Sequence, residues 1–219
     1  SMSEPQSAPD VAVRLGAALK HLEAGRAADA EGLLRITHAE APRHPDVLNL
    51  LGVSLQMQGR SEDAVPYLAQ AVALHPDSGM YRANFGAALA LAGRGREAAA
   101  ELERSLEIRP DNPVAKRNLG VVIAGTLRGP NAISGLERAV TLAPDAPEPH
   151  LALAHAYLEA RRGHEAAEMA SKVLELKITA KQAEQARFLR EAALGTSPER
   201  APAAYVRELF DVYAPHFDT

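Results

Sequence analysis

The sequence predicts an all-α protein, a solenoid in which antiparallel helix pairs stack side by side. Three observations predict this fold class. Proline, glycine and alanine recur at intervals of 34 residues, which indicates a repeat architecture. Apolar residues within each interval follow helical spacing. Alanine supplies 44 of the 219 residues and aromatic residues only nine, so the helices that alanine favours can pack closely.

The 34-residue interval keeps three residue types in one register. The prolines of the series are Pro42, Pro76, Pro110 and Pro144. One glycine series is Gly25, Gly59 and Gly93, a second is Gly52, Gly86 and Gly120, and the alanines are Ala30, Ala64, Ala98, Ala132 and Ala166. One such unit cannot bury both its faces alone, so neighbouring units must stack and form a concave wall from their first helices.

Each unit is predicted to hold two helices joined by a tight turn. In residues 45–78 the apolar spacing is interrupted at Gly59, which suits a left-handed helix stop. Ser61 is expected to be the N-cap of the second helix, and Pro76 to end it. Where the two helices cross, we expect Gly52 in the first to face Ala64 in the second, because larger side chains would separate the axes beyond about 8–10 Å.

A 34-residue helix-turn-helix with small residues at positions 8 and 20 and proline at position 32 resembles the tetratricopeptide repeat (TPR). The resemblance implies a right-handed superhelix of antiparallel helix pairs with C-terminal capping helices. It covers five units, which are residues 11–44, 45–78, 79–112, 113–146 and 147–180. In the fourth unit Leu127 replaces the turn glycine and Gly129-Pro130 follows, so this turn is expected to be remodelled.

The two ends of the chain differ from the repeats. Residues 1–10 are expected to be disordered, with Ser1 before Met2 as a cloning remnant. Residues 181–195 are expected to form a capping helix that covers the last apolar face and ends at Gly195. Residues 196–219 are expected to hold an aromatic helix and a linker.

Charge and composition exclude several classes of function. The net charge of −4 and the isoelectric point near 6.1 argue against nucleic acid and anionic membrane surfaces as partners. Without cysteine there is no disulfide framework or thiolate metal site, and no apolar run approaches the ~18 residues that span a bilayer. We therefore expect a cytoplasmic protein. The eight histidines are scattered, so we expect them on the surface or in loops rather than at a metal.

No phosphate-binding loop, nucleophile elbow or paired carboxylate with suitable context lies between Val11 and Gly195, so we expect no catalytic residue and no cofactor in this chain. Cationic residues recur at position 4 as Arg14, Arg82 and Lys116. They could form a stripe for an acidic partner, but we favour stems that lie along the neighbouring helix in place of the usual bulky residue.

The resemblance to TPR proteins places a binding groove on the first helices, at positions 2, 5, 6, 9, 12 and 13. The candidate groove residues are Asn49, Val53, Gln56, Asn84, Ala87, Arg117, Asn118 and Val121. Asn84 and Asn118 share position 6 and resemble the asparagine ladder of O-linked N-acetylglucosamine transferases, which would hold an extended peptide backbone. In the alternative, each asparagine bonds a neighbouring helix. Leu15 and Leu19 stand where the two-carboxylate clamp of chaperone adaptors needs lysine and asparagine, which argues against that mode.

The tail has an apolar helix face that needs a cover. Its predicted contact residues are Tyr205, Leu209, Phe210 and Tyr213. This face could fold back on the solenoid, enter the groove of another copy, or belong to a domain outside the chain. Residues 204–218 resemble the segment that joins TPR repeats to the catalytic domain in bacterial TPR-containing S-adenosylmethionine-dependent methyltransferases. That resemblance implies a non-catalytic region, with S-adenosylmethionine bound by a domain that this chain lacks.

The sequence therefore predicts a protein-interaction module whose groove binds a protein or peptide and recruits it to a methyltransferase domain. The alternative is a self-associating structural scaffold, a homo-oligomer formed through the C-terminal helix. An enzyme complete within these 219 residues is not expected, because the repeats occupy most of the chain.

Overall fold

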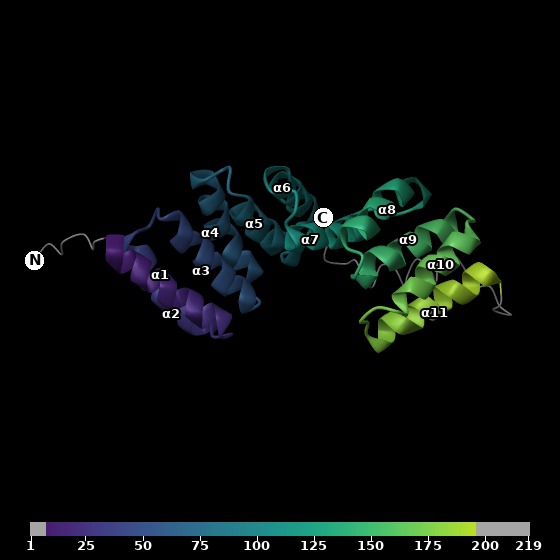
Figure 1. The fold of residues 1–219 in the computed structure, drawn as a ribbon, viewed down its shortest axis with the longest axis horizontal. Helices are drawn as coiled ribbons and strands as arrows, with labels where there is room; N and C mark the ends of the chain where they lie inside the picture. Colours follow the sequence, from purple (N-terminus) through teal and green to yellow (C-terminus); the bar gives the residue numbers. More distant parts are fainter. Residues whose placement is uncertain (1–7, 196–219) are drawn as a thin grey trace, which may run out of the picture.

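The computed structural model describes residues 8–195, which form eleven α-helices and one short 3₁₀ helix, with no strand in that range (Figure 1). The first six helices are α1 (Ala8–Glu23), α2 (Ala27–Glu40), α3 (Pro45–Met57), α4 (Ser61–Leu74), α5 (Gly79–Leu91) and α6 (Gly95–Ile108). The others are α7 (Pro113–Thr126), η1 (Pro130–Ala132), α8 (Ile133–Leu142), α9 (Pro147–Glu159), α10 (Gly163–Val173) and α11 (Ala180–Leu194). The predictions for residues 1–7 and 196–219 lie outside the described residues.

The helices follow one another along the long axis of the molecule, from purple to yellow in Figure 1. Each odd-numbered helix packs against its even-numbered partner and also against the next odd-numbered helix, as α3 does with α4 and α5. The even-numbered helices α2 to α8 pack mainly on odd-numbered ones. The odd-numbered helices therefore form the inner layer of a curved solenoid, as the repeat pattern predicts.

The first three turns use the predicted glycines in a left-handed conformation. Gly25, Gly59 and Gly93 have φ values of 76°, 76° and 80°. Arg60 N then donates to Leu55 O at 2.9 Å and closes the end of α3. The prediction of Ser61 as N-cap is wrong by one residue, because Arg60 takes that place and no side chain caps the helix.

The fifth turn has the same backbone without the glycine. Arg161 occupies the equivalent position with a φ of 60°. Among residues 8–195 it is the only residue other than glycine that has a positive φ. Its N–H donates to Leu158 O at 3.0 Å, and Arg162 N donates to Tyr157 O at 2.8 Å, which repeats the bonding of the earlier turns. The solenoid therefore imposes this turn on a side chain that disfavours it.

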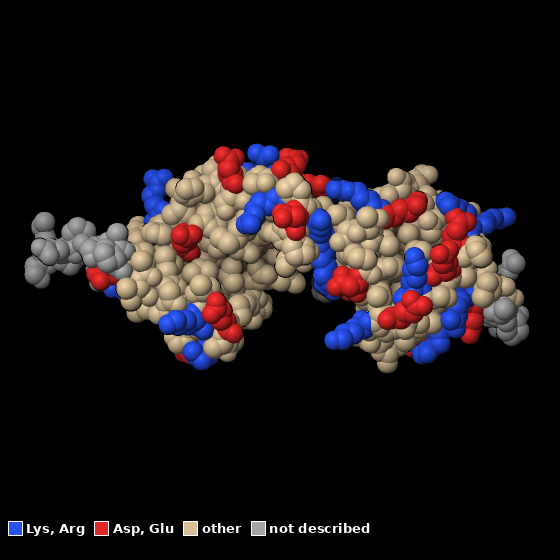
Figure 2. Space-filling model, viewed as in Figure 1, with Lys and Arg blue, Asp and Glu red and all other residues tan. Residues whose placement is uncertain are grey.

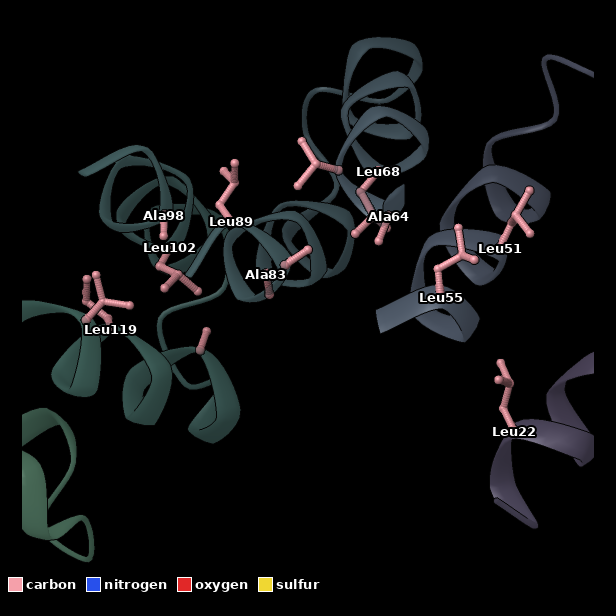
Figure 3. Close-up of a cluster of buried hydrophobic side chains, with 14 of the residues drawn as sticks. Leu22, Leu51, Leu55, Ala64, Leu68, Ala83, Leu89, Ala98, Leu102 and Leu119 are labelled. Carbon is pink, nitrogen blue, oxygen red and sulfur yellow. The ribbon is translucent and has the colours of Figure 1, made fainter. Parts of the chain in front are cut away.

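Gly52 and Gly86 of the first helices pack against a leucine of the second helix rather than against the expected alanine. A Cβ on Gly52 would lie 2.4 Å from Leu68 Cγ, and one on Gly86 would lie 2.7 Å from Leu102 Cγ. Both leucines belong to a series at 34-residue spacing that is buried throughout, namely Leu34, Leu68, Leu102 and Leu136. Figure 3 shows Leu68 beside Ala64 and Leu102 beside Ala98 in the shared apolar core, so the alanines flank the leucine that fills the notch.

The turn of the fourth unit is remodelled, as its sequence predicts. Helix α7 continues to Thr126, Gly129 takes a φ of 83°, and Pro130–Ala132 forms η1 before a shortened α8. Gly120 accordingly meets Ala143 Cβ and the Ala139 carbonyl instead of a leucine, at 2.6 and 2.7 Å from an added Cβ. The altered turn therefore changes how α8 crosses α7.

The two ends of the described chain have clear helix boundaries. Helix α1 begins at Ala8, so residues 8–10 are helical rather than disordered, which suits Asp10 in the first turn, near the positive end of the helix. Helix α11 begins with a capping box between Thr179 and Gln182 and ends at Gly195 in the left-handed conformation. It packs on α9 and α10 and buries one face of the last repeat.

Candidate functional site: the inner face of the solenoid

Large apolar side chains are exposed mainly on the inner layer. Among the described residues eight large hydrophobic side chains are exposed, and five of them lie at groove positions 2, 9 or 13 of α1, α3, α5 and α7. We call these five the apolar stripe: Leu19, Met57, Met80, Leu91 and Val114. The other three are Val13, Ile36 and Leu194. Exposed apolar surface is thus concentrated on the side of the first helices that a ligand of the groove would contact.

Charged side chains are unevenly distributed over the visible face of the molecule. In Figure 2 the surface over α3 and α5 is mostly uncharged, whereas charged side chains are more frequent over α10 and α11, and the molecule is hollowed between its two ends. Asp46, at position 2 of α3, accepts a hydrogen bond from the Tyr81 hydroxyl. Burial and this carboxylate raise the pKa of Tyr81, so the hydroxyl stays protonated as the donor.

The three groove asparagines have different surroundings. Asn84 Nδ2 donates to Asn49 Oδ1 at 2.9 Å across α3 and α5. Asn49 is only 2 % exposed, so it supports Asn84 and does not face a ligand directly. The position 35 residues before Asn118 is Ala83, which offers no side-chain acceptor, and within residues 8–195 the half-buried Asn118 side chain makes no hydrogen bond. Asn84 therefore follows the helix-bonding alternative, whereas Asn118 keeps its amide for another partner.

The remaining candidates also lie on the inner layer. The residues Val53, Gln56, Ala87 and Val121 are half-buried. Arg117 is exposed, with Nε 3.4 Å from Asp145 Oδ2. This exposed pair is weak, so an acidic group of a ligand could replace Asp145. The sequence did not single out Met57, Met80, Leu91 and Val114, although their repeat positions were enough to find them.

Two of the three cationic side chains at position 4 are paired within the solenoid. Arg82 Nη1 donates to Glu101 at 2.9 Å and its Nε donates to Pro76 O at 2.7 Å, while Arg14 bonds Glu40. Both arginines thus link first and second helices of their own unit. Because both arginines are paired inside the fold, they do not present a stripe of free charge to an acidic partner.

Two histidines differ from their predicted surface position. His150 and His155 are 4 % and 5 % exposed, because α9 is enclosed by α7, α8, α10 and α11. Burial lowers the pKa of His150, and its Nδ1 lies 2.8 Å from Ala146 O, which suits the neutral ring as donor. Within residues 8–195 no group of three histidines and acidic residues is placed to hold a metal. No helix in that part is long and apolar enough to cross a membrane.

Comparisons with known proteins agree with the repeat geometry. Residues 15–79 and 54–113 match the model of a tetratricopeptide repeat family. Residues 8–195 have the fold of a TPR solenoid. No curated protein sequence matches the chain.

Solved structures extend the TPR likeness beyond the matched residues. Residues 41 to the end of MamA from Desulfovibrio magneticus RS-1 are 22 % identical, with a TM-score of 0.63, covering 81 % of this chain and 97 % of that one. PilF of Pseudomonas aeruginosa is 18 % identical, with a TM-score of 0.63, covering 93 % and 88 %. At these identities the likeness shows the TPR fold alone.

A mutant of the Thermobaculum terrenum O-GlcNAc transferase is 27 % identical, with a TM-score of 0.55 over 64 % of this chain. The match covers only 27 % of the transferase, which is therefore a much longer protein than this chain.

TPR solenoids present extended concave surfaces to other proteins. The TPR fold of residues 8–195 is therefore that of a protein-interaction module.

Proposed function

We propose that the inner layer of the solenoid binds an extended peptide or a helix from a partner protein. The single observation that carries this proposal is the apolar stripe. Five exposed apolar side chains on four successive first helices lie at positions that face the groove. A ligand that covered them would remove apolar surface from water, which is the main driving force of association.

The polar groups of the groove suit a peptide backbone. The Asn118 amide can donate to and accept from one peptide unit, and Asn84 retains one amide hydrogen and oxygen lone pairs after bonding Asn49. One helical turn before these asparagines, Val114 and Met80 offer apolar contacts for the ligand's side chains. The preferred ligand therefore has apolar side chains, backbone groups that are free to form hydrogen bonds, and an acidic residue that lies near Arg117.

A random peptide display library presented to the full chain tests this proposal. Selected peptides should bind the wild-type chain, and Asn118→Ala should weaken their binding roughly five- to tenfold, the loss of about one hydrogen bond. Ile36→Asp, on the outer helix α2, is the matched control and should leave affinity unchanged. Selected peptides that bind equally well after both Asn118→Ala and Leu91→Asp would reject the groove.

We also propose that this module recruits its partner to an S-adenosylmethionine-dependent methyltransferase domain in the parent protein. The proposal is supported by the amino-acid sequence of residues 204–218, which resembles the segment that joins TPR repeats to such a domain. These residues lie outside the described part of the chain. The test is the reading frame after Thr219. A strand that ends in Gly-x-Gly within about fifty residues supports the parent enzyme, and an immediate stop codon rejects it. The cytoplasmic location stays a prediction.

A further inference from the structure

We propose that the apolar stripe is the docking site for residues 204–214 of a second copy of this chain. The inference rests on the proposed function, because it names an occupant of the same groove. It also assigns the predicted contact residues of the tail to a surface. Two molecules would each insert one tail helix into the inner layer of the other, so the partner copy completes the site.

The two surfaces match in chemistry. The face of the tail segment is formed by Tyr205, Val206, Leu209, Phe210 and Tyr213, at spacings of one helix side. The stripe contains Met57 and Met80, two of the four methionines of the chain. Methionine adapts to irregular surfaces, and its sulfur makes favourable contacts with aromatic rings. An amphipathic helix in an apolar groove is a recurring mode of recognition.

The length of the chain after α11 favours a groove on a second molecule. Eight residues, 196–203, separate Gly195 from the segment, and they include Pro198 and Pro202. Extended, they cover about 25–28 Å. Helices that pack together lie about 8–10 Å apart, so α5 is about 24–30 Å and α3 about 32–40 Å from α11. The tail of the same molecule reaches α7 easily but reaches the centre of the stripe only with a fully stretched linker.

Two reciprocal insertions give a closed dimer. Each groove accepts one tail and each tail occupies one groove, so no unpaired tail remains to extend the assembly. The segment of about eleven residues is about 16 Å long as a helix, which spans the neighbouring inner helices α3 and α5. The wild-type chain should therefore dimerise reversibly and stop at two copies.

Sedimentation equilibrium of the full chain tests this arrangement with two variants. The groove variant carries Met80→Asp and Leu91→Asp, at exposed side chains where the fold tolerates charge. The tail variant carries Leu209→Asp and Phe210→Asp. Each should raise the dimer Kd at least about tenfold, because a charge opposes burial of the apolar contact. The control Ile36→Asp, exposed on α2, should dimerise as the wild type does.

Mixing the two variants gives the decisive result. The tail variant keeps its groove and the groove variant keeps its tail, so the mixture should form a 1:1 complex that neither variant forms alone. A monomeric wild-type chain, or a mixture that stays monomeric while both variants remain folded by circular dichroism, would overturn the inference. That result would leave the proposed function standing, because peptide selection on the groove does not depend on the tail. Dimers that persist in both variants also overturn it.

Discussion

Arg161 offers a direct test of how the solenoid imposes its turns. It adopts a φ of 60° at the place where the first three units have glycine. Its side chain is exposed and makes no ion pair or hydrogen bond within residues 8–195. Arg161→Gly therefore removes a backbone conformation that a Cβ disfavours and sacrifices no side-chain contact. We expect the variant to be more stable.

The expected gain is the difference between two backbone effects. A non-glycine residue in the left-handed region costs roughly 1–2 kcal/mol. Glycine in turn gives the unfolded chain more freedom, which costs about 0.4–1 kcal/mol. The net effect is a stabilisation of about 1 kcal/mol, or about 2–4 °C in Tm for a chain of this size. The reverse change at an equivalent turn, Gly59→Ala with a φ of 76°, should destabilise by a similar amount.

Urea unfolding followed by far-UV circular dichroism measures both changes. Hydrogen exchange should place the gain in α9 and α10, which the turn joins. Arg161→Ala is the matched control, because it removes the same side chain and keeps the Cβ, so it should leave stability nearly unchanged. If Arg161→Gly fails to stabilise while Gly59→Ala destabilises, the fifth turn is not strained. An equal gain from Arg161→Ala would assign the effect to the side chain.

Two further predictions concern packing between helices and the hydrogen bonds of Glu31. Gly52→Ala should lower the free energy of unfolding in urea by about 1–3 kcal/mol, because the added Cβ would overlap Leu68. The matched control is Gly16→Ala, at a helix position with open space around it. This change should raise the free energy of unfolding by up to about 1 kcal/mol. Glu31→Gln should cost about 1 kcal/mol at pH 7, because hydrogen bonds led by that from Arg35 lower the pKa of Glu31. A lowered pKa stabilises the fold above the unfolded value near 4.3, so the difference between wild type and variant should shrink as the pH falls below it.

The sequence predicted the parts of the fold that depend on local chemistry. A left-handed turn needs glycine and a helix end needs a stop, so Gly59 and Pro76 could be placed from their types alone. The remodelled fourth turn followed from the same logic, because Leu127 cannot easily take the glycine's conformation. Where the local rule fails, at Arg161, packing of the flanking helices decides the backbone.

Contacts between units were harder to predict, because they depend on the angle at which helices cross. Sequence spacing placed an alanine opposite Gly52, but a side chain on a helix leans toward the preceding turn, and Leu68 reaches the notch from one turn further along. The same limit applies to His150. The histidines are scattered in the sequence and were expected at the surface, yet α7, α8, α10 and α11 enclose α9 and bury His150.

The asparagines show how one residue of offset separates structural from binding roles. The side-chain hydrogen bonds between α3 and α5 join residues 35 apart, one more than the repeat length, so position 5 of the second unit meets position 6 of the third. Asn49 at position 5 therefore bonds Asn84, whereas the same offset gives Asn118 an alanine, Ala83, at position 5 of the preceding unit. A reading by repeat position alone treats Asn84 and Asn118 as equal rungs of a ladder. The offset makes Asn84 partly committed to the fold and leaves Asn118 as the side chain whose loss should be felt mainly by a ligand.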